Sequence, residues 1–378
     1  MIPGTSDEQK ELREILRDLF TSEAQKFAAR ETLTNPHLWN QELWSKLARE
    51  LGVLGLGVSE EYGGSGGSIV DAAILHEEAG RLIVPGAFVG SLMLGVPLLQ
   101  SIAAESIPAA EMLKDICAGS TIVTVVLDIT HDLDAQSNRV NFNNASGVLN
   151  GEVVRVIDAH RAGQLLVVAL DEEGAVVLIE LSAQASGVTI TEQLCLDSTV
   201  DLGRVEFNGA IGAVLARGES VSKAVHEMNW TAEVLISARQ LGIARGALEM
   251  SVEYAKLRQQ FGRAIGSFQA IKHILADVHV EIVSAAAALT SSLREENYGN
   301  QVRSSIARST VSDALWLAAS ENIQVHGGVG FTWELDAHLF FKSAVVYREF
   351  FDTSEYHRER IARLILPSAV LDEPTVQI

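Results

Sequence analysis

The sequence has few cysteines to form disulfides and no long apolar run to cross a membrane. It contains only two cysteines, Cys117 and Cys195, whose separation matches no metal-binding or redox motif, so a disulfide framework has no support. No uninterrupted apolar run reaches the roughly 18 residues that a membrane-spanning helix needs. The first residues, from Met1 to Glu8, lack the basic stretch and apolar core of a secretory signal. We therefore expect a cytoplasmic protein that binds no membrane.

Basic residues are also scarce. The chain has 29 Lys and Arg residues against 49 Asp and Glu residues, which gives a formal net charge of −20 at pH 7. Such a chain repels nucleic-acid backbones and anionic head groups, and no local basic patch offsets this charge. Hydrophobic residues make up 47% of the sequence, enough to fill a sizeable core. The composition thus argues against a nucleic-acid role and favours small molecules or proteins as partners.

Apolar periodicity gives the first third of the chain a helical character. A capping box of Ser6 and Gln9 opens a helical pattern that continues to about Cys117. The run from Glu61 to Gly67 interrupts this pattern because it is too rich in glycine for a helix. The amphipathic segments that flank this run are residues 41–51 and 69–82.

The pattern changes to short runs of Val, Ile and Leu near Gly119, and the connections between them are too short for crossover helices. This pattern predicts a mainly antiparallel sheet or barrel. Helical periodicity returns after Glu219 in four long segments with short joins, which predicts an antiparallel bundle. The expected strands are residues 121–127, 152–157, 164–170, 175–181 and 203–207, and the expected long helices are residues 221–260, 268–296, 301–326 and 335–351.

These patterns together predict an α+β fold in three parts. We expect an N-terminal α-helical domain at residues 1–118 and a middle antiparallel β domain at residues 119–218. A C-terminal four-helix bundle is expected at residues 219–378.

Two segments in the bundle combine glycine with polar side chains that could hold an anionic cofactor. In the first, Arg258-Gln259-Gln260-Phe261-Gly262, a guanidinium at a helix end precedes the start of another helix, which offers bidentate and backbone N–H donors to phosphate. In the second, from Gln324 to Glu334, closely spaced glycines let the backbone approach a ligand. Taken alone, each segment is more typical of a helix cap or a turn.

The two segments in this order, in a helix–strand–helix chain, resemble the acyl-CoA dehydrogenase family over essentially the whole sequence. The same likeness is carried by Gln240 to Leu248, by Phe268 to Asp277 and by Glu60-Glu61-Tyr62-Gly63-Gly64. In that family FAD lies at a subunit interface, with the flavin and substrate held mostly by one subunit and the pyrophosphate and adenosine by its neighbour. The resemblance implies an FAD-dependent oxidoreductase that carries out α,β-dehydrogenation of an acyl-CoA thioester, with an electron-transfer flavoprotein as acceptor.

Transferred by motif, one set of residues would contact the FAD of the partner subunit. The residues of the first segment and the helix after it are Arg258, Gln260, Phe261, Ile265, Phe268, Gln269 and Ile271. The residues expected to line the diphosphate and adenosine region are Gln324, Gly327 and Gly328. The resemblance therefore implies an intact half-site that faces a neighbour.

The other half of the site departs from the family pattern. Family members carry a Thr-Glu-Pro-x-x-Gly-Ser-Asp stretch in the β domain and a Trp-Ile-Thr/Ser stretch further on. The matching places here are residues 127–136 and 154–159, and they contain neither motif. The acids Asp128, Asp132 and Asp134 would repel flavin and CoA phosphates, or they would simply lie in a solvated loop.

The catalytic base is also missing from its expected places. The reaction needs a carboxylate near the substrate α-carbon, because the α-proton must leave while a hydride passes to the flavin. The family places this Glu at one of two positions, which hold Ala232 and Phe351 here. Glu233 is a weak candidate, because one residue along a helix turns a side chain by roughly 100° and only a register shift or bulge would bring it round. Asp352 and Glu349 are weaker still, and an ordinary solvated or ion-paired role is the alternative for all three carboxylates.

Other polar features suggest no chemistry. The histidines have no partners at metal-ligand spacing, so no metal site is expected. His357, with Arg358 and Arg360, is typical of an exposed helix end. The glycine run at residues 63–67 lacks the Lys-Ser/Thr pair of a phosphate loop.

An intact neighbour-facing half-site beside an altered half of its own resembles one subunit of the heteromeric acyl-CoA dehydrogenases of actinobacterial steroid side-chain degradation. This interpretation predicts a β-type subunit of an α2β2 complex, whose partner dehydrogenase subunit supplies the base. Two alternatives stay open. One is a homomeric self-tetramer that uses Glu233 or another displaced carboxylate, and the other is a flavin-free scaffold or CoA-binding protein.

Overall fold

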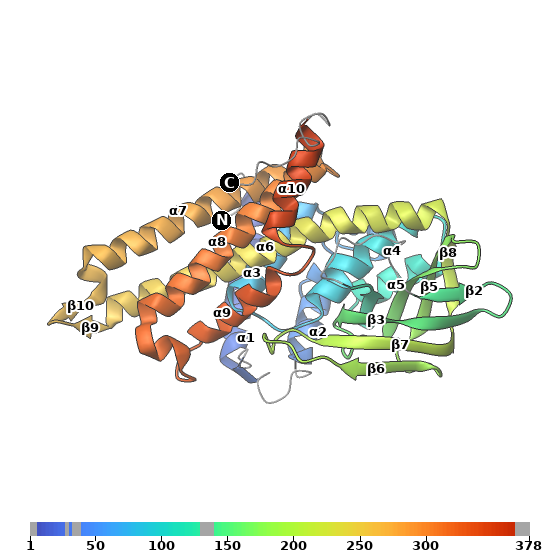
Figure 1. Cartoon of the computed structure of the whole chain (residues 1–378), viewed down its shortest axis with the longest axis horizontal. Coiled ribbons are helices and arrows are strands. Elements are labelled where there is room, and N and C mark those ends of the chain that lie inside the picture. The colour runs from blue at the N-terminus through green and yellow to red at the C-terminus, as the bar shows by residue number, and fades with distance from the viewer. Residues whose placement is uncertain (1–5, 27–29, 32–38, 129–139, 367–378) are drawn as a thin grey trace, which may run out of the picture.

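The structure is a computed structural model that describes residues 6–26, 30–31, 39–128 and 140–366. Helices come first, a sheet follows, and helices return (Figure 1). The sheet lies at one end of the molecule, and the long helix α6 (Glu219–Leu257) runs from it to the opposite end, where the short strands β9 and β10 lie (Figure 1). This order of helices, sheet and helices is the one that the sequence predicts.

The N-terminal helices form where the periodicity places them. The capping box at the start of α1 is present, with Gln9 N donating to Ser6 Oγ (3.2 Å) and Ser6 N donating to Gln9 Oε1 (3.0 Å). Ser68 and Asp71 cap α3 in the same reciprocal way. The helices of this part are α1 (Asp7–Lys26), α2 (Gln41–Arg49), α3 (Ile69–Arg81), the π-helical η4 (Phe88–Gly95), α4 (Val96–Ile102) and α5 (Ile107–Cys117).

The middle part is one mixed sheet with the order β6-β7-β3-β2-β4-β5-β8, and β1 pairs with β4. Most neighbours are antiparallel as predicted, but β1 and β2 both run parallel to β4. The sequence pattern did not reveal β2, β6 and β8, which are short and expose much of their length. The strands are β1 (Val123–Val126), β2 (Asn141–Asn143), β3 (Val148–Ile157), β4 (Gln164–Leu170), β5 (Val176–Ser182), β6 (Val188–Glu192), β7 (Leu202–Ile211) and β8 (Ala213–Arg217).

The C-terminal part contains the four predicted long helices and one more. The bounds of α8 match the prediction, whereas α6, α7 and α9 end earlier, and α10 packs against α8 as an additional helix. The helices after α6 are α7 (Gln269–Ser292), α8 (Gln301–His326), α9 (Ala337–Tyr347) and α10 (Ser354–Ile365). Cys117 and Cys195 are both free thiols, and burial raises the pKa of each, to about 11 and about 12 respectively.

Glycines bring α3 and α6 into backbone contact. A Cβ atom on Gly242 would lie 1.9 Å from the carbonyl oxygen of Glu77, and one on Gly246 would lie 2.1 Å from that of Arg81. Gly80 makes the reciprocal approach, because its Cβ would lie 2.2 Å from the Arg239 carbonyl oxygen. Any larger residue at these three positions would push the two helices apart.

A buried cluster of charges holds α1 onto this helix pair. Arg13, with its side chain 3% exposed, donates to Glu77 (2.7 Å) and to Glu78 (2.6 Å), and both carboxylates are 1% exposed. Arg245 of α6 also pairs with Glu77, and Arg17 and Arg81 pair with Glu78. The two glutamates depend on these guanidinium groups, since an unpaired buried carboxylate is costly.

Replacing Arg13 with methionine should therefore destabilise the chain by about 3 kcal/mol, because two buried carboxylates lose their shared partner. The control is Lys10→Met, which removes an exposed pair with Asp7 on the same helix and should change stability by less than about 0.5 kcal/mol. Urea unfolding of the two variants measures the difference. Equal effects would show that the buried cluster contributes no more than a surface pair.

Candidate active site and cofactor interface

The first predicted cofactor segment forms a hairpin at the end of α6. Strands β9 (Gln259–Gln260) and β10 (Arg263–Ala264) are joined by Phe261 and Gly262, which both have positive φ, at 53° and 77°. Two such residues are typical of the type I′ turn that fits the twist of a hairpin. Phe261 is 91% exposed at the tip, so this hairpin presents an apolar ring outward.

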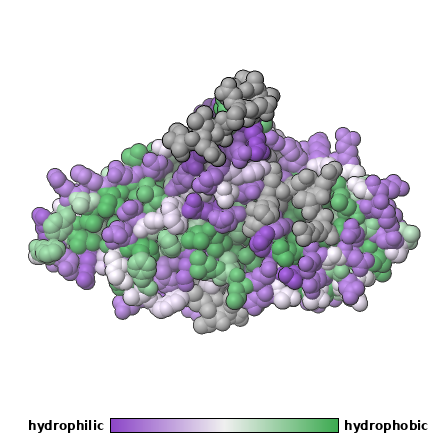
Figure 2. Space-filling view, in the orientation of Figure 1, coloured by the Kyte–Doolittle hydropathy of each residue, from purple (hydrophilic) through white to green (hydrophobic). Residues whose placement is uncertain are grey.

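The residues predicted to contact FAD surround this hairpin. The side chains that carry a charge, an amide or an aromatic ring are those of Arg258, Gln260, Phe261, Phe268 and Gln269. Ile265 and Ile271 are half-buried beside them. Phe268 lies edge-on to Phe261 at 6.1 Å and precedes α7, whose first turn has no side-chain cap. The backbone N–H groups of that turn are thus available to an anion. Figure 2 shows hydrophobic residues in green among polar ones at the end of the molecule that carries the hairpin.

The second predicted segment lies at the same end of the bundle. Gly327 follows α8 with φ 61° and ψ −142°, and a Cβ on either Gly327 or Gly328 would meet no atom within 4 Å. The backbone here therefore borders open space. His326 stacks on Tyr254 of α6 with ring centroids 4.2 Å apart, which ties the end of α8 to the last turns of α6. Gln324 is exposed on the same turn of α8.

Glu233 lies away from both segments, inside the bundle. It is 5% exposed, accepts a hydrogen bond from Ser304 Oγ of α8 (2.6 Å) and pairs with Arg360 of α10 (2.5 Å). Ala232 beside it is fully buried. A carboxylate held in this way ties three helices together, and it would have to leave its ion pair to take a proton.

The other base position is occupied by a buried aromatic ring. Phe351 is 4% exposed and has φ 55°, and its carbonyl oxygen lies 2.8 Å from Nε2 of His357. Arg308 is fully buried and donates to the carbonyl oxygens of Phe350 (2.5 Å) and Asp352 (3.0 Å). The buried side chains of Arg308 and His357 therefore hold this loop in place through its backbone carbonyl oxygens.

His357 differs from its prediction as an exposed helix end. It is 1% exposed, and burial lowers its pKa to about 3, so the ring is neutral near pH 7. The prediction was wrong because it took the charges of Arg358 and Arg360 as a sign that this helix end is exposed, although the His357 side chain on the same helix is buried. Burial likewise lowers the pKa of Arg308 to about 10.

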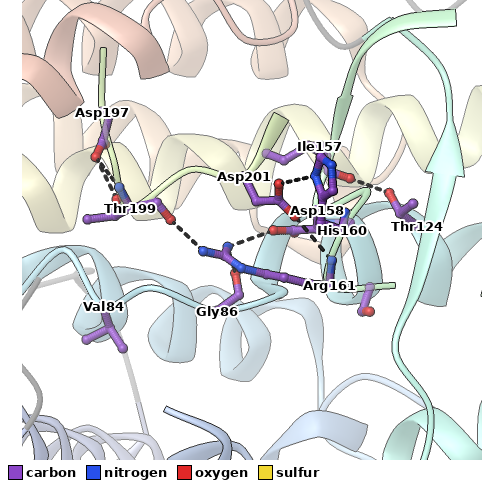
Figure 3. Close-up of polar contacts among 12 residues, drawn as sticks. Val84, Gly86, Thr124, Ile157, Asp158, His160, Arg161, Asp197, Thr199 and Asp201 are labelled. Carbon is purple, nitrogen blue, oxygen red and sulfur yellow. Dashed lines mark hydrogen bonds and ion pairs between the residues drawn. The ribbon is translucent and has the colours of Figure 1, made fainter. Parts of the chain in front are cut away.

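The stretch at residues 154–159 carries a buried polar network that sequence reasoning missed. Asp158 is 2% exposed with φ 55°, and it accepts a hydrogen bond from Arg161 (2.9 Å) (Figure 3). It also accepts from the backbone N–H of Gly90 (2.9 Å). Arg161 also donates to the carbonyl oxygens of Gly86 (3.2 Å) and Thr199 (3.1 Å). The network thus joins the sheet domain to the loop and helix that precede α4.

Electrostatics show how enclosed this network is. Burial raises the pKa of Asp158 to about 6, and the nearby Arg161 offsets part of that shift. Next to it, the hydrogen bond to Asp201 (2.8 Å) raises the pKa of His160. No sequence motif marks the network, because its partners come from positions far apart in the chain.

Of the three acids expected near the family's first β-domain motif, the structure describes only Asp128. Asp128 forms a bidentate ion pair with Arg155 (3.0 and 2.5 Å), so it is paired and does not lie in a solvated loop. The prediction for Asp132 and Asp134 falls outside the described residues. In the described part of the chain no cluster of His, Cys, Asp and Glu could hold a metal ion.

The two regions that the family pattern assigns to FAD differ in what they offer the cofactor. At the hairpin end, exposed cationic and amide side chains border open space, which suits a diphosphate. At the Asp158 end, buried side chains donate to and accept from one another across the chain. The hairpin end therefore suits an anionic cofactor better than the Asp158 end does.

Comparison with known proteins supplies the family. The model of the acyl-CoA dehydrogenase N-terminal domain matches residues 6–120, and that of the acyl-CoA dehydrogenase C-terminal domain matches residues 224–366. Acyl-CoA dehydrogenase IpdE2 of Mycobacterium tuberculosis is 33% identical over 338 residues, which cover 89% of this chain and 91% of that protein.

Solved structures show the same fold. The ChsE4-ChsE5 complex from Mycobacterium tuberculosis aligns with a TM-score of 0.81 at 24% identity and covers 98% of this chain and 99% of that chain. A variant of the Tcur3481-Tcur3483 steroid ACAD aligns with a TM-score of 0.82 at 24% identity and covers 96% of this chain and 99% of that chain. With both domain models and a relative of this identity, the chain belongs to the acyl-CoA dehydrogenase family of oxidoreductases.

Proposed function

We propose that this chain is the β-type subunit of a heteromeric, FAD-dependent acyl-CoA dehydrogenase. In this proposal it completes the FAD site of a partner subunit in an α2β2 complex and has no catalytic base of its own. The observation that carries the proposal is the Asp158–Arg161 network, which closes the region where the chain would hold a flavin itself. The opposite end stays open and cationic.

Residues of the open end would hold the cofactor by its phosphates and adenosine. The guanidinium of Arg258 can donate two parallel hydrogen bonds to a phosphate, and the uncapped start of α7 adds backbone N–H groups. Gln324 and the exposed turn at Gly327 and Gly328 would take the adenosine end, because nothing there blocks close approach. When bound, FAD supplies the hydride acceptor, and this chain's residues bind and orient it.

The base would come from the partner subunit. Of the two positions where the family carries it, one is filled by the buried ring of Phe351 and the other by Ala232. The neighbouring Glu233 is engaged by Arg360 and Ser304, which disfavours the homomeric alternative that relies on it. This chain would thus take part in catalysis without touching the α-carbon of the substrate.

An apolar face on α7 supports assembly with a partner. α7 lies on the outer side of the bundle (Figure 1), and its residues Val280 and Val283 are 59% and 52% exposed. α7 also meets the length and composition of a membrane-crossing helix, with 28% of its apolar window buried, a property that helices at protein interfaces and in cores share. We assign this face to the partner subunit because exposed apolar patches on folded chains mark such contacts.

A structural neighbour supports a proposal for the substrate class. That neighbour is described as a steroid ACAD, so we propose as substrate the CoA thioester of a steroid side chain, converted in the cytoplasm. An electron-transfer flavoprotein is the proposed electron acceptor.

Flavin content tests the proposal. Co-expression with its partner acyl-CoA dehydrogenase subunit should give a yellow complex with one FAD per two chains, because only the partner supplies a flavin-ring site. The measurement is the flavin absorbance after release, against protein concentration. One FAD per chain, or a yellow preparation of this chain alone that oxidises an acyl-CoA, would sink the proposal, and a colourless complex would favour the flavin-free scaffold.

A single-residue test addresses the cofactor contact. Arg258→Ala should weaken FAD retention by the complex about tenfold or more, since a charge-assisted bidentate contact to phosphate is lost. Arg294→Ala is the matched control, because Arg294 is an exposed arginine at the far end of α7 that pairs with Glu296. Titration of the apo complex with FAD measures both. Equal affinity in the two variants would remove Arg258 from the cofactor site.

A further inference from the structure

Three buried loops of this chain contain residues with a strained backbone. Ile83 (φ 51°) lies between α3 and η4, Asp158 (φ 55°) follows β3, and Phe351 (φ 55°) occupies one of the two base positions of the family. Each of these side chains is buried. A positive φ is an outlier for isoleucine or phenylalanine and persists only where surrounding contacts hold it. The contacts that hold these loops therefore show how distant parts of the chain are linked.

The sheet holds the segment from the end of α3 to the first turn of η4. Asp158 accepts from the backbone N–H of Gly90 (2.9 Å) and from Arg161 (2.9 Å). Arg161 in turn donates to the carbonyl oxygen of Gly86 (3.2 Å). Two side chains that follow β3 thus bind this segment at two points of its backbone.

Arg239 of α6 binds the same segment from the helical bundle. Its guanidinium donates to the carbonyl oxygen of Val84 (2.7 Å) and to the hydroxyl of Tyr347 at the end of α9 (2.8 Å). It also lies over the rings of Phe88 and Tyr347, 5.2 and 5.4 Å from their centroids. Arg239 is 2% exposed, so water competes little for these contacts. One buried guanidinium therefore joins the segment before η4 to α9.

The next link is Gln240, the neighbour of Arg239 on α6. Its amide donates to the carbonyl oxygen of Tyr347 (2.7 Å) and accepts from Arg308 of α8 (2.6 Å). Arg308 donates to the carbonyl oxygens on both sides of Phe351 (2.5 and 3.0 Å). Gln240 and Arg308 are both fully buried. The contacts that begin at the sheet thus end at the loop that occupies the base position.

These contacts form one relay of buried polar side chains. Its members are Asp158, Arg161, Arg239, Gln240, Tyr347 and Arg308. We propose that the relay makes the segment at residues 83–90 and the loop at residues 350–352 open and close together. Loss of one bond would leave a buried polar group without its partner and weaken the neighbouring bonds.

A contact that a ligand or partner makes with one of these loops would then change the stability of the other. This inference goes beyond the proposed function, because the relay uses only contacts within this chain. It holds or fails whether or not the chain binds FAD or a partner subunit.

Hydrogen exchange of the full chain, followed by mass spectrometry, tests the relay. Tyr347→Phe removes only the hydroxyl that accepts from Arg239 and keeps the ring. We expect amide exchange to become about tenfold faster both at residues 83–90 and at residues 346–357, because the link between the two loops is lost. Unchanged exchange in either segment would overturn the proposal.

The matched control is Ser251→Ala. It removes a buried hydrogen bond from α6 to Asn322 of α8 (2.8 Å) that lies outside the relay. Exchange in both segments should stay within about twofold of the original chain. If Ser251→Ala accelerated both segments as much as Tyr347→Phe does, the effect would be a general loss of stability and the proposal would fail.

A substitution at the sheet end tests whether the effect travels along the relay. Asp158→Asn places an amide nitrogen where a carboxylate oxygen accepts a hydrogen bond, so one of its two contacts is lost. Exchange at residues 346–357 should become about fivefold faster, although the change is made at the other end of the relay. In the Tyr347→Phe chain, the same substitution should accelerate only residues 83–90.

Thermal melting checks that each variant is folded. Exchange at residues 346–357 that does not respond to Asp158→Asn would contradict the relay. An equal response with and without the Tyr347 hydroxyl would contradict it as well.

Discussion

The close packing of α3 against α6 is the constraint on which the rest of the structure depends. Gly80, Gly242 and Gly246 remove the side chains that would separate the two helices, so backbone meets backbone. This contact fixes the long helix α6, which carries Glu233 and leads into the hairpin at its C-terminal end. It also buries Glu77 and Glu78, which is why four arginines gather around them.

The two regions that the family pattern assigns to FAD lie in different surroundings. At the sheet end, Arg161 and Asp158 bond to each other and reach the N-terminal part through Gly86 and Gly90. At the hairpin end, Arg258 and the glycine turn face outward. A chain with a net charge of −20 thus keeps exposed cationic and amide groups where a partner's dinucleotide would lie. This asymmetry is the physical basis of the proposed division of labour between two subunits.

The sequence predicts well those features that depend on local pattern. Period-3.6 segments place α1, α3, α6 and α8, the Ser6–Gln9 box marks a helix start, and the motif at Arg258 coincides with a real hairpin. The order of helices, sheet and helices follows from the same patterns.

Features that depend on contacts between residues far apart in the sequence could not be predicted. The parallel pairing of β1 with β4 depends on three-dimensional register, and the partners of Asp158 lie as far along the chain as Gly90. The burial of His357 depends on Phe351 and Ser305, and not on its charged neighbours in α10.

The central claim is that this chain binds FAD only from its hairpin end. The most direct measurement is an experimental structure of the complex with its partner and FAD. The account predicts density for the diphosphate beside Arg258 and Gly327 of this chain, the flavin ring against the partner's sheet, and an unbroken contact between Asp158 and Arg161. A flavin ring beside Ile157 and Asp158 of this chain, with that contact broken, would contradict it.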